Sequence, residues 1–261
     1  MHKKRLIPKL QMKAATRGGA ERMVLVTTRN FDQVFEVGDP LSQAKIYQSQ
    51  AADELVFLDL DATNEGRAAM DGVVLKASEE IFMPITVGGG VRSIDDFRRL
   101  LKCGADKVSV NTWAVERPGL IAEASESFGA QCVVLSIDYR CEAGGWRVWT
   151  RGGRQRTELS PVEWAVEGAR LGAGEILLTS IDRDGTRLGL DLEAIRAVAS
   201  AVTIPVIAAG GCGKASHFSE GFLDGKADAV SAGTYFCFKD ENPMQTRAQI
   251  KNAGIPIRMH L

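Results

Sequence analysis

The chain has 261 residues, with 32 basic and 33 acidic side chains and a formal net charge of −1. Such a balance gives no positive footprint for nucleic acid or an anionic membrane, and the strand-sized apolar runs are too short to span a bilayer. No apolar secretory segment follows the basic start, and the five cysteines lack CxxC spacing, so we expect a cytoplasmic protein with free thiols and neither a metal nor another cofactor.

Short apolar segments and longer amphipathic segments alternate along the whole chain. The predicted strands are 5–11, 54–60, 83–88, 107–111, 132–138, 175–179, 205–209 and 227–232. The predicted helices are 41–50, 67–81, 94–102, 119–128, 161–171, 192–201, 217–223 and 243–252. Continuously apolar strands are typical of parallel sheets covered on both faces, and eight strand–helix units predict a single-domain (βα)8 barrel over residues 1–261. A doubly wound sheet is the alternative.

The two halves of the chain resemble each other. PITVGGGVRS at 84–93 returns about half a chain length later as PVIAAGGCGK at 205–214. ADELVFLDLD at 52–61 returns at the same distance as AGEILLTSID, and GADKVSVNT at 104–112 returns as GKADAVSAGT. These matches indicate a duplicated array of four units, so we expect half-barrels at approximately 1–128 and 129–261, each with its own copy of a site. A doubly wound sheet would not explain this repeat.

Two connections are longer than usual, and each follows the first strand of its half. Residues 13–38 contain a possible extra strand at 23–28, whereas residues 139–157 suggest a hairpin that turns at Gly144 and Gly145. Long connections in compact domains are more often functional than idle, so we expect both of them at the active face of the barrel.

Glycines and small polar residues follow the predicted strands of both halves, where the active sites of such barrels lie. A backbone without a Cβ can approach an oxyanion closely and point its amides at it, so we predict two phosphate cradles, one per half. The first is Gly90, Asn111 and Thr112, and the second is Asp184, Gly185, Gly211, Gly233 and Thr234. Thr179, which ends its strand, is a further substrate-binding candidate. Each glycine cluster taken alone could equally serve only the turns.

Asp138 ends an apolar strand and should face the barrel mouth, where apolar neighbours raise a carboxyl pKa toward values that suit proton transfer. Its counterpart in the first half is Gln11, whose amide can orient a ligand but cannot exchange a proton at neutral pH. The pair of carboxylates that would be natural in this architecture is therefore absent. Other acids at or past strand ends could equally cap the next helix or loop; these are Asp59, Asp61, Asp182 and Asp184.

Charged side chains stand at the opposite ends of four strands. Arg5, Glu54, Lys107 and Glu175 begin their strands, so they could form a ring of ion pairs that closes the barrel floor. They could also form a polar constriction at a rear entrance.

The chain resembles the cyclase subunit of imidazole glycerol phosphate synthase along nearly its whole length, most specifically in ADELVFLDLDAT, TVGGGVRS, GADKVSVNT, GAGEILLTSIDRDGT and DGKADAVSAGTYF. The resemblance implies a glutaminase partner on the barrel floor, ammonia that passes through the barrel, and a bis-phosphate substrate at the mouth. It also implies a four-residue ammonia gate. Arg5, Lys107 and Glu175 match this gate, while Ser49 falls where a glutamate is expected.

Departures from the family pattern gather on the first strand and its loop. The resemblance places catalytic carboxylates at the ends of the first and fifth strands; Asp138 matches the second, and Gln11 stands in place of the first. Lys9 replaces a residue that is commonly Cys or small, and 25–28 replace a VVKG motif with its nearby lysine. Such divergent paralogues are associated with bacterial surface-polysaccharide (lipopolysaccharide) pathways, where ammonia reaches an asparagine-synthetase-like protein that amidinates a sugar.

Three functions follow from these observations. The preferred one is an ammonia conduit of the surface-sugar branch with little cyclase chemistry of its own. The second is a working cyclase of histidine biosynthesis, in which Gln11 positions the substrate beside Asp138. The third is a phosphosugar isomerase-like barrel without a glutaminase. Restoring Asp at Gln11 should raise cyclase turnover with added ammonia if the rest of the ancestral site is intact.

Overall fold

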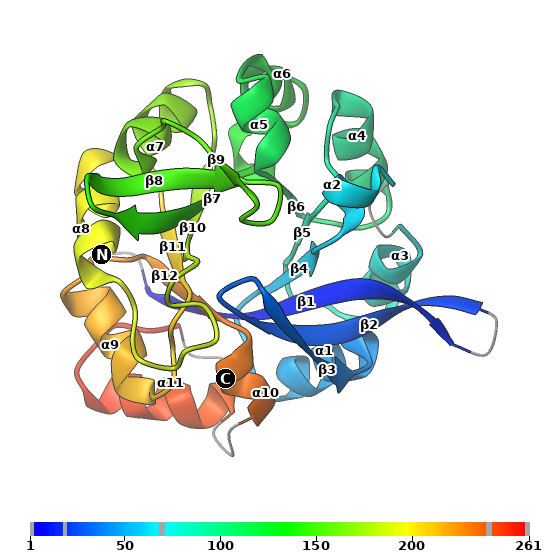
Figure 1. The fold of residues 1–261 in the computed structure, drawn as a ribbon. Helices are drawn as coiled ribbons and strands as arrows, with labels where there is room; N and C mark the ends of the chain where they lie inside the picture. Colours follow the sequence, from blue (N-terminus) through cyan, green and yellow to red (C-terminus); the bar gives the residue numbers. More distant parts are fainter. Residues whose placement is uncertain (1–2, 18–19, 68–70, 239–241, 259–261) are drawn as a thin grey trace.

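Eight parallel strands close into a barrel in the computed structural model, which describes residues 3–17, 20–67, 71–238 and 242–258 (Figure 1). The strands are β1 (Arg5–Arg17), β4 (Leu55–Asp59), β5 (Ile85–Gly88), β6 (Lys107–Val110), β7 (Val133–Glu142), β10 (Glu175–Ser180), β11 (Val206–Ala209) and β12 (Ala229–Ala232). β1 pairs with both β4 and β12, and β10 pairs with both β7 and β11. The predicted (βα)8 barrel is therefore confirmed, because a doubly wound sheet would stay open.

Helices surround this barrel. They are α1 (Pro40–Ser49), α2 (Ala62–Glu65), α3 (Asp71–Glu80), α4 (Ile94–Lys102), α5 (Thr112–Glu116), α6 (Gly119–Phe128), α7 (Pro161–Arg170), α8 (Leu192–Ala201), α9 (Ala215–Leu223), α10 (Thr234–Phe238) and α11 (Pro243–Asn252), with a 3-10 turn at Ala130–Cys132. Each predicted helix has a counterpart, and residues 68–70 of one prediction lie outside the described part. The unpredicted α2, α5 and α10 are short and follow barrel strands. In the described part of the chain, no helix is long and apolar enough to cross a membrane.

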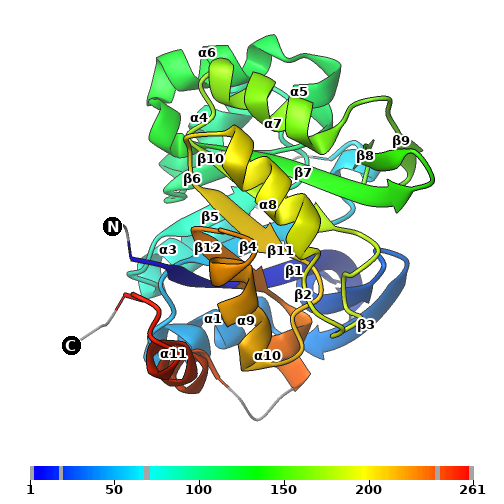
Figure 2. The same ribbon diagram turned by 90° about the vertical axis from the view of Figure 1, so that its left-hand side faces the viewer.

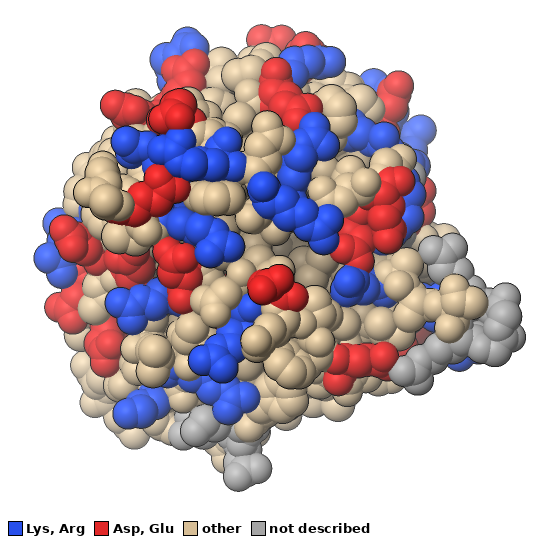
Figure 3. Space-filling model, viewed as in Figure 1, with Lys and Arg blue, Asp and Glu red and all other residues tan. Residues whose placement is uncertain are grey.

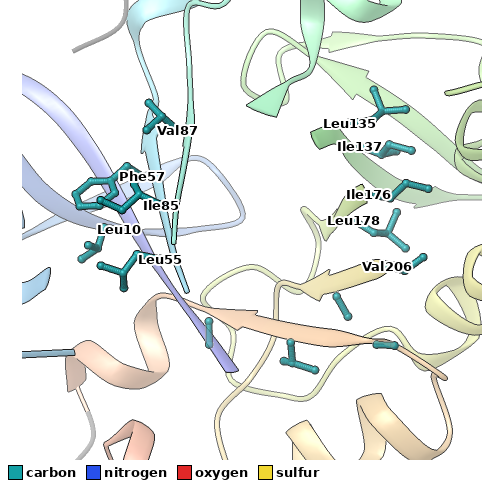
Figure 4. Packing of buried hydrophobic residues seen from close by; sticks show 14 of the residues in the cluster. Leu10, Leu55, Phe57, Ile85, Val87, Leu135, Ile137, Ile176, Leu178 and Val206 are labelled. Carbon is teal, nitrogen blue, oxygen red and sulfur yellow. The ribbon is translucent and has the colours of Figure 1, made fainter. Parts of the chain in front are cut away.

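Side chains that alternate along the strands divide the interior into two apolar clusters. Outward-facing residues such as Leu10, Phe57 and Leu178 pack between the strands and the helices, and Figure 4 shows them on strands at opposite sides of the barrel. The inward-facing cluster fills the barrel itself; it consists of Ile7, Val56, Val134, Leu177, Ile207, Ala209 and Ala229. The inward positions above and below this cluster carry the polar residues of the mouth and the floor.

Both long connections form antiparallel extensions of barrel strands, as predicted. β1 runs on to Arg17 and pairs with β2 (Ala20–Arg29), which pairs with β3 (Gln33–Gly38). β7 runs on to Glu142 and pairs with β8 (Gly145–Thr150), followed by β9 (Gln155–Arg156). Figure 2 shows both extensions at one end of the barrel, opposite the end where β1 begins. They stand over the carboxyl ends of the strands, which form the mouth.

Candidate functional site

A cavity of about 410 Å³ opens at the mouth. Predicted site residues from both halves line it; they are Gln11, Gly90, Asn111, Thr112, Asp138 and Thr179. Residues that the sequence did not single out for the site also line it, among them Thr28 of β2 and the 152–154 segment between β8 and β9. Cavities of this size hold small-molecule ligands. The extensions therefore build walls of the candidate site.

Asp138 lies deep in this cavity and keeps only partial access to it. Strand register sets its carboxyl group beside Thr179 of β10, and Asn111 Nδ2 donates a hydrogen bond of 2.8 Å to its Oδ2. Burial raises the pKa of Asp138 to about 7, and the charge of Asp184 acts in the same direction. Lys9 and the hydrogen bonds from Thr179 and Asn111 lower this pKa but do not cancel the effect of burial. Asp138 can thus give or take a proton near neutral pH.

Gln11 belongs to a buried hydrogen-bond chain. Its Nε2 donates to Thr28 Oγ1 at 3.0 Å, and the Thr28 hydroxyl donates to Asp184 Oδ2. Asp184 Oδ1 lies 3.7 Å from Lys9 Nζ. Burial raises the pKa of Asp184, although Lys9 and Thr28 oppose the shift. The amide of Gln11 is therefore held in one orientation by Thr28, which Asp184 holds in turn.

The second cradle is assembled as predicted but is almost closed. Asp184, Gly185, Gly211, Gly233 and Thr234 line one small cavity of about 10 Å³, roughly the space that one water molecule needs. A phosphate group would require this cavity to expand. A Cβ at Gly185 would lie 2.0 Å from Thr28 O, and one at Gly211 would lie 2.1 Å from Gly189 O. The close backbone packing alone therefore requires these two glycines, and phosphate binding stays a prediction.

The first cradle is open to the large cavity, and two of its polar groups already have partners within the protein. The Gly90 amide donates to Thr63 Oγ1 at 3.2 Å, and Thr112 Oγ1 accepts a bond of 3.0 Å from the Arg151 amide. Arg151 also forms a salt bridge of 2.6 Å with Glu116 of α5. The β8–β9 connection is thereby fastened over the cradle.

At the barrel floor, four charged side chains form the ring that their places at the strand starts predicted. Arg5 bonds Glu54 at 2.8 Å and also bonds Glu175, while Lys107 Nζ lies 2.9 Å from Glu54 and 2.8 Å from Glu175. Each acid thus contacts both cations. Burial alone would raise the pKa of Glu54, but Arg5 and Lys107 outweigh burial and lower it.

The expectation that Ser49 belongs to this ring is wrong. Ser49 is the last residue of α1, exposed in the outer helical layer, and its hydroxyl donates to Ile46 O at 2.8 Å. A short side chain on an outer helix cannot reach the barrel axis. Glu54 takes the fourth position because it directly precedes β4 and lies on the same inward-facing side as Val56.

Asp59 and Asp182 fix loops at the mouth, so the capping interpretation is the better one for them, whereas Asp61 makes no capping bond and pairs with Lys13. Asp59 accepts the Ala62 amide at 3.1 Å and pairs with Arg67, and Asp182 accepts the Cys141 amide at 2.8 Å. Figure 3 shows basic and acidic side chains interspersed around the hollow of this face. Among the described residues, no group of three or more His, Cys, Asp or Glu is placed to hold a metal ion.

A family model described as "Histidine biosynthesis protein" matches residues 15–241 of the chain. The chain is 48% identical to the imidazole glycerol phosphate synthase subunit HisF of Geobacillus thermodenitrificans over 257 residues, which are 98% of this chain and 99% of the relative. It is 49% identical over 260 residues to the putative imidazole glycerol phosphate synthase subunit hisF2 of Prochlorococcus marinus, covering 99% of each chain. A subunit HisF of Clostridium botulinum is 50% identical over 232 residues, 88% of this chain and 92% of that one.

Proposed function

Because this chain belongs to the histidine biosynthesis protein family, we propose that it is the barrel subunit of an enzyme of the imidazole glycerol phosphate synthase type. A glutaminase docks on the floor and releases ammonia, which passes through the barrel to a bis-phosphate substrate at the mouth. The observation that carries this proposal is that a charged ring at one end of the barrel interior faces an acid with a pKa of about 7 at the other.

The proposed route for ammonia runs through the packed barrel interior, and the character of the side chains there supports it. Apolar side chains such as Ile7 and Leu177 alternate there with small hydroxyl residues, and Ser231 Oγ is buried with no hydrogen-bond partner among the described residues. An unpaired hydroxyl can bond ammonia transiently. Lys107 is the most exposed member of the floor ring, at 18% of its side chain, so rotation of its flexible stem is the smallest movement that would open the ring.

At the mouth we propose the cyclase reaction itself. Ammonia is incorporated, and the intermediate is cleaved into imidazole glycerol phosphate and an aminoimidazole carboxamide ribotide. Asp138 exchanges the protons, Asn111 and Thr179 hold its carboxyl group, and Gln11 orients the substrate by hydrogen bonding. The two cradles bind the two phosphates, and the second must expand to do so. The family relatives named as synthase subunits support this reading over the surface-sugar one.

A second candidate function rests on Gln11. With an amide where the resemblance places a carboxylate, the barrel would deliver ammonia from the glutaminase to an asparagine-synthetase-like enzyme that amidinates a bacterial surface sugar. Here the mouth would bind phosphates with little turnover of its own.

A glutamine-dependent assay with purified glutaminase separates these functions, scored for both the imidazole product and an amidinated sugar. The proposal expects the imidazole product from wild-type protein with glutamine or with ammonium chloride. Product only from the Gln11→Asp variant would favour the second candidate. A barrel that neither binds nor stimulates any glutaminase would overturn both and favour an isomerase-like protein.

A further inference from the structure

Lys9 lies between the two cradles and borders both of their cavities. It follows Ile7 on the inward-facing side of β1, is only 4% exposed, and places its ammonium 3.7 Å from Asp184 Oδ1. Asp138 lines the same large cavity from β7. We infer that Lys9 is a positioning residue of the mouth, whose ammonium is the counter-ion shared by Asp184 and Asp138.

Charge counting in the interior supports this role. A buried charge is costly unless it is paired, and here one buried cation faces two carboxyl groups. The three groups can carry balanced charge only if the two acids share one proton. Burial raises the pKa of both Asp138 and Asp184, and the charge of Lys9 lowers each of them. Because Lys9 offsets only part of the effect of burial, the pKa of both acids stays raised, so the mouth retains a proton that ordinary carboxyl groups would lose.

The other groups packed around Lys9, Asp184 and Asp138 do not supply a second counter-ion for the two acids. From the connection after β11, the buried Cys212 faces Lys9 as a neutral thiol, because burial raises its pKa far above neutrality. Thr28, Asn111 and Thr179 contribute uncharged donors. Three cations at the rim have acidic partners of their own; the pairs are Lys13 with Asp61, Arg67 with Asp59, and Arg140 with Asp182. Arg154 and Asp32 also line the large cavity.

Lys9 also helps to fix the orientation of the Gln11 amide, through the intervening side chains of Asp184 and Thr28. The ion pair holds Asp184, Asp184 accepts the Thr28 hydroxyl, and Thr28 in turn accepts the amide of Gln11. Loss of the ammonium would leave Asp184 without its cation and free it to protonate or turn. Gln11 would then lose its fixed orientation, so one residue couples the proton at Asp138 to the substrate-orienting amide.

The test is a titration of the Asp138 carboxyl carbon by NMR in the ligand-free, full-length protein, with the resonance assigned by its loss in Asp138→Asn. Lys9→Met should raise the midpoint by about 1 pH unit or more, because an attractive charge is removed. Asp184→Asn should lower it, because a repulsive charge is removed, and the double variant should return toward the wild-type midpoint. Lys45→Met, at the exposed pair with Glu80, should leave it unchanged.

Two further variants keep the inference falsifiable if Lys9→Met folds poorly. Lys9→Arg retains the charge and should retain the midpoint, and Asp184→Asn alone should still show the downward shift. A midpoint that stays at the wild-type value in Lys9→Met and Asp184→Asn would overturn the inference.

The catalytic consequence rests on the proposed function and is measured separately. The limb of the pH–rate profile that reports Asp138 should move with the NMR midpoint in each variant, upward in Lys9→Met and downward in Asp184→Asn. NMR shifts in a protein without cyclase turnover would leave the inference standing and reject the proposed function. Turnover with an unmoved limb would reject the inference alone.

Discussion

The floor and the mouth of this barrel each carry a cluster of buried charges, and they differ in balance. At the floor, two cations meet two carboxylates, and each acid bonds both cations. At the mouth, the one buried cation among the described residues that faces Asp138 and Asp184 is Lys9. A balanced cluster fixes its members as ions, whereas an unbalanced one keeps a proton that can move. The barrel floor is thus held by ion pairs, whereas the mouth keeps a carboxyl group that can exchange a proton.

Glu54 at the floor and Asp138 at the mouth show this difference as pKa shifts in opposite directions. Burial favours the neutral form of both Glu54 and Asp138. Two cations reverse that tendency for Glu54 and lower its pKa, whereas one shared cation and a second carboxylate leave that of Asp138 raised to about 7. Two neighbouring cations at Glu54, against one cation and a second carboxylate at Asp138, therefore account for the opposite signs.

The largest expected change in stability follows from breaking the balance at the floor. Glu54→Gln leaves one buried cation short of a partner and should lower the free energy of unfolding by about 3–5 kcal/mol at pH 7. Because the folded-state pKa of Glu54 is lowered, its contribution is present above its ordinary pKa of 4.5 and is lost as the pH falls through the folded value. Urea denaturation at pH 7 and pH 4 measures both effects. Glu80→Gln, at an exposed pair, should cost less than about 1 kcal/mol; an equal loss would refute the comparison.

At the mouth, removal of an acid should have the opposite sign. The pKa of Asp138 rises from 3.8 to about 7 on folding, so its contribution to stability is present below 3.8 and lost as the pH rises through 7. Asp138→Asn should therefore be more stable than wild type at pH 8, by on the order of 2–4 kcal/mol, and equal to it near pH 4. Denaturation at the two pH values tests this. Asp182→Asn, which alters the acceptor of the Cys141 amide at the rim, should not be stabilised at pH 8; a destabilised Asp138→Asn at pH 8 would contradict the account.

A third carboxylate at the mouth, introduced at Gln11, should increase the excess of acids over cations there. Gln11→Glu keeps the size of the side chain but replaces its donor with an acceptor beside Thr28, whose hydroxyl already serves Asp184. We expect a loss of about 1–3 kcal/mol in unfolding free energy at pH 8 and a smaller loss at pH 5, where the new acid can protonate. Gln249→Glu, at an exposed position of α11, is the matched control. Equal stability of Gln11→Glu and wild type would show that the chain of hydrogen bonds is not formed.

The smallest effect concerns ligand binding at the first cradle. Thr112→Val removes the acceptor of the Arg151 amide and one donor for an anion, so the affinity for inorganic phosphate should fall about fivefold, equivalent to about 1 kcal/mol. Calorimetric titration measures it. Thr157→Val, whose hydroxyl bonds Val148 O away from the cavity, should bind phosphate as wild type does. Unchanged affinity in Thr112→Val would remove the first cradle from the proposal.

Local pattern and repeat were sufficient to predict most of the fold. The half-length repeat predicted the number of strand–helix units. Helix starts also follow the local sequence, since Ser93 and Asp96 form a capping box at the start of α4, and Asp39 and Asp191 cap their helices. The place of Glu54 at the start of a predicted strand put it in the floor ring, and only the family resemblance suggested Ser49.

The parts that sequence could not predict depend on contacts between distant segments. Lys9 stood out as a departure, but its partner Asp184 lies in the other half of the chain, and no local spacing connects them. The closure of the second cradle follows from the packing of Gly185 against Thr28 of β2, in an extension whose path the sequence left open. Side-chain packing across the mouth therefore determines which predicted cradle is open.

The most direct test is ammonia-driven turnover of the bis-phosphate substrate by wild type and Asp138→Asn at pH 8, where both should be folded. The account predicts turnover by wild type and a loss of about 10²–10⁴-fold in the variant, because the only proton-transfer group assigned to the mouth is removed. Equal turnover by the two proteins would contradict it.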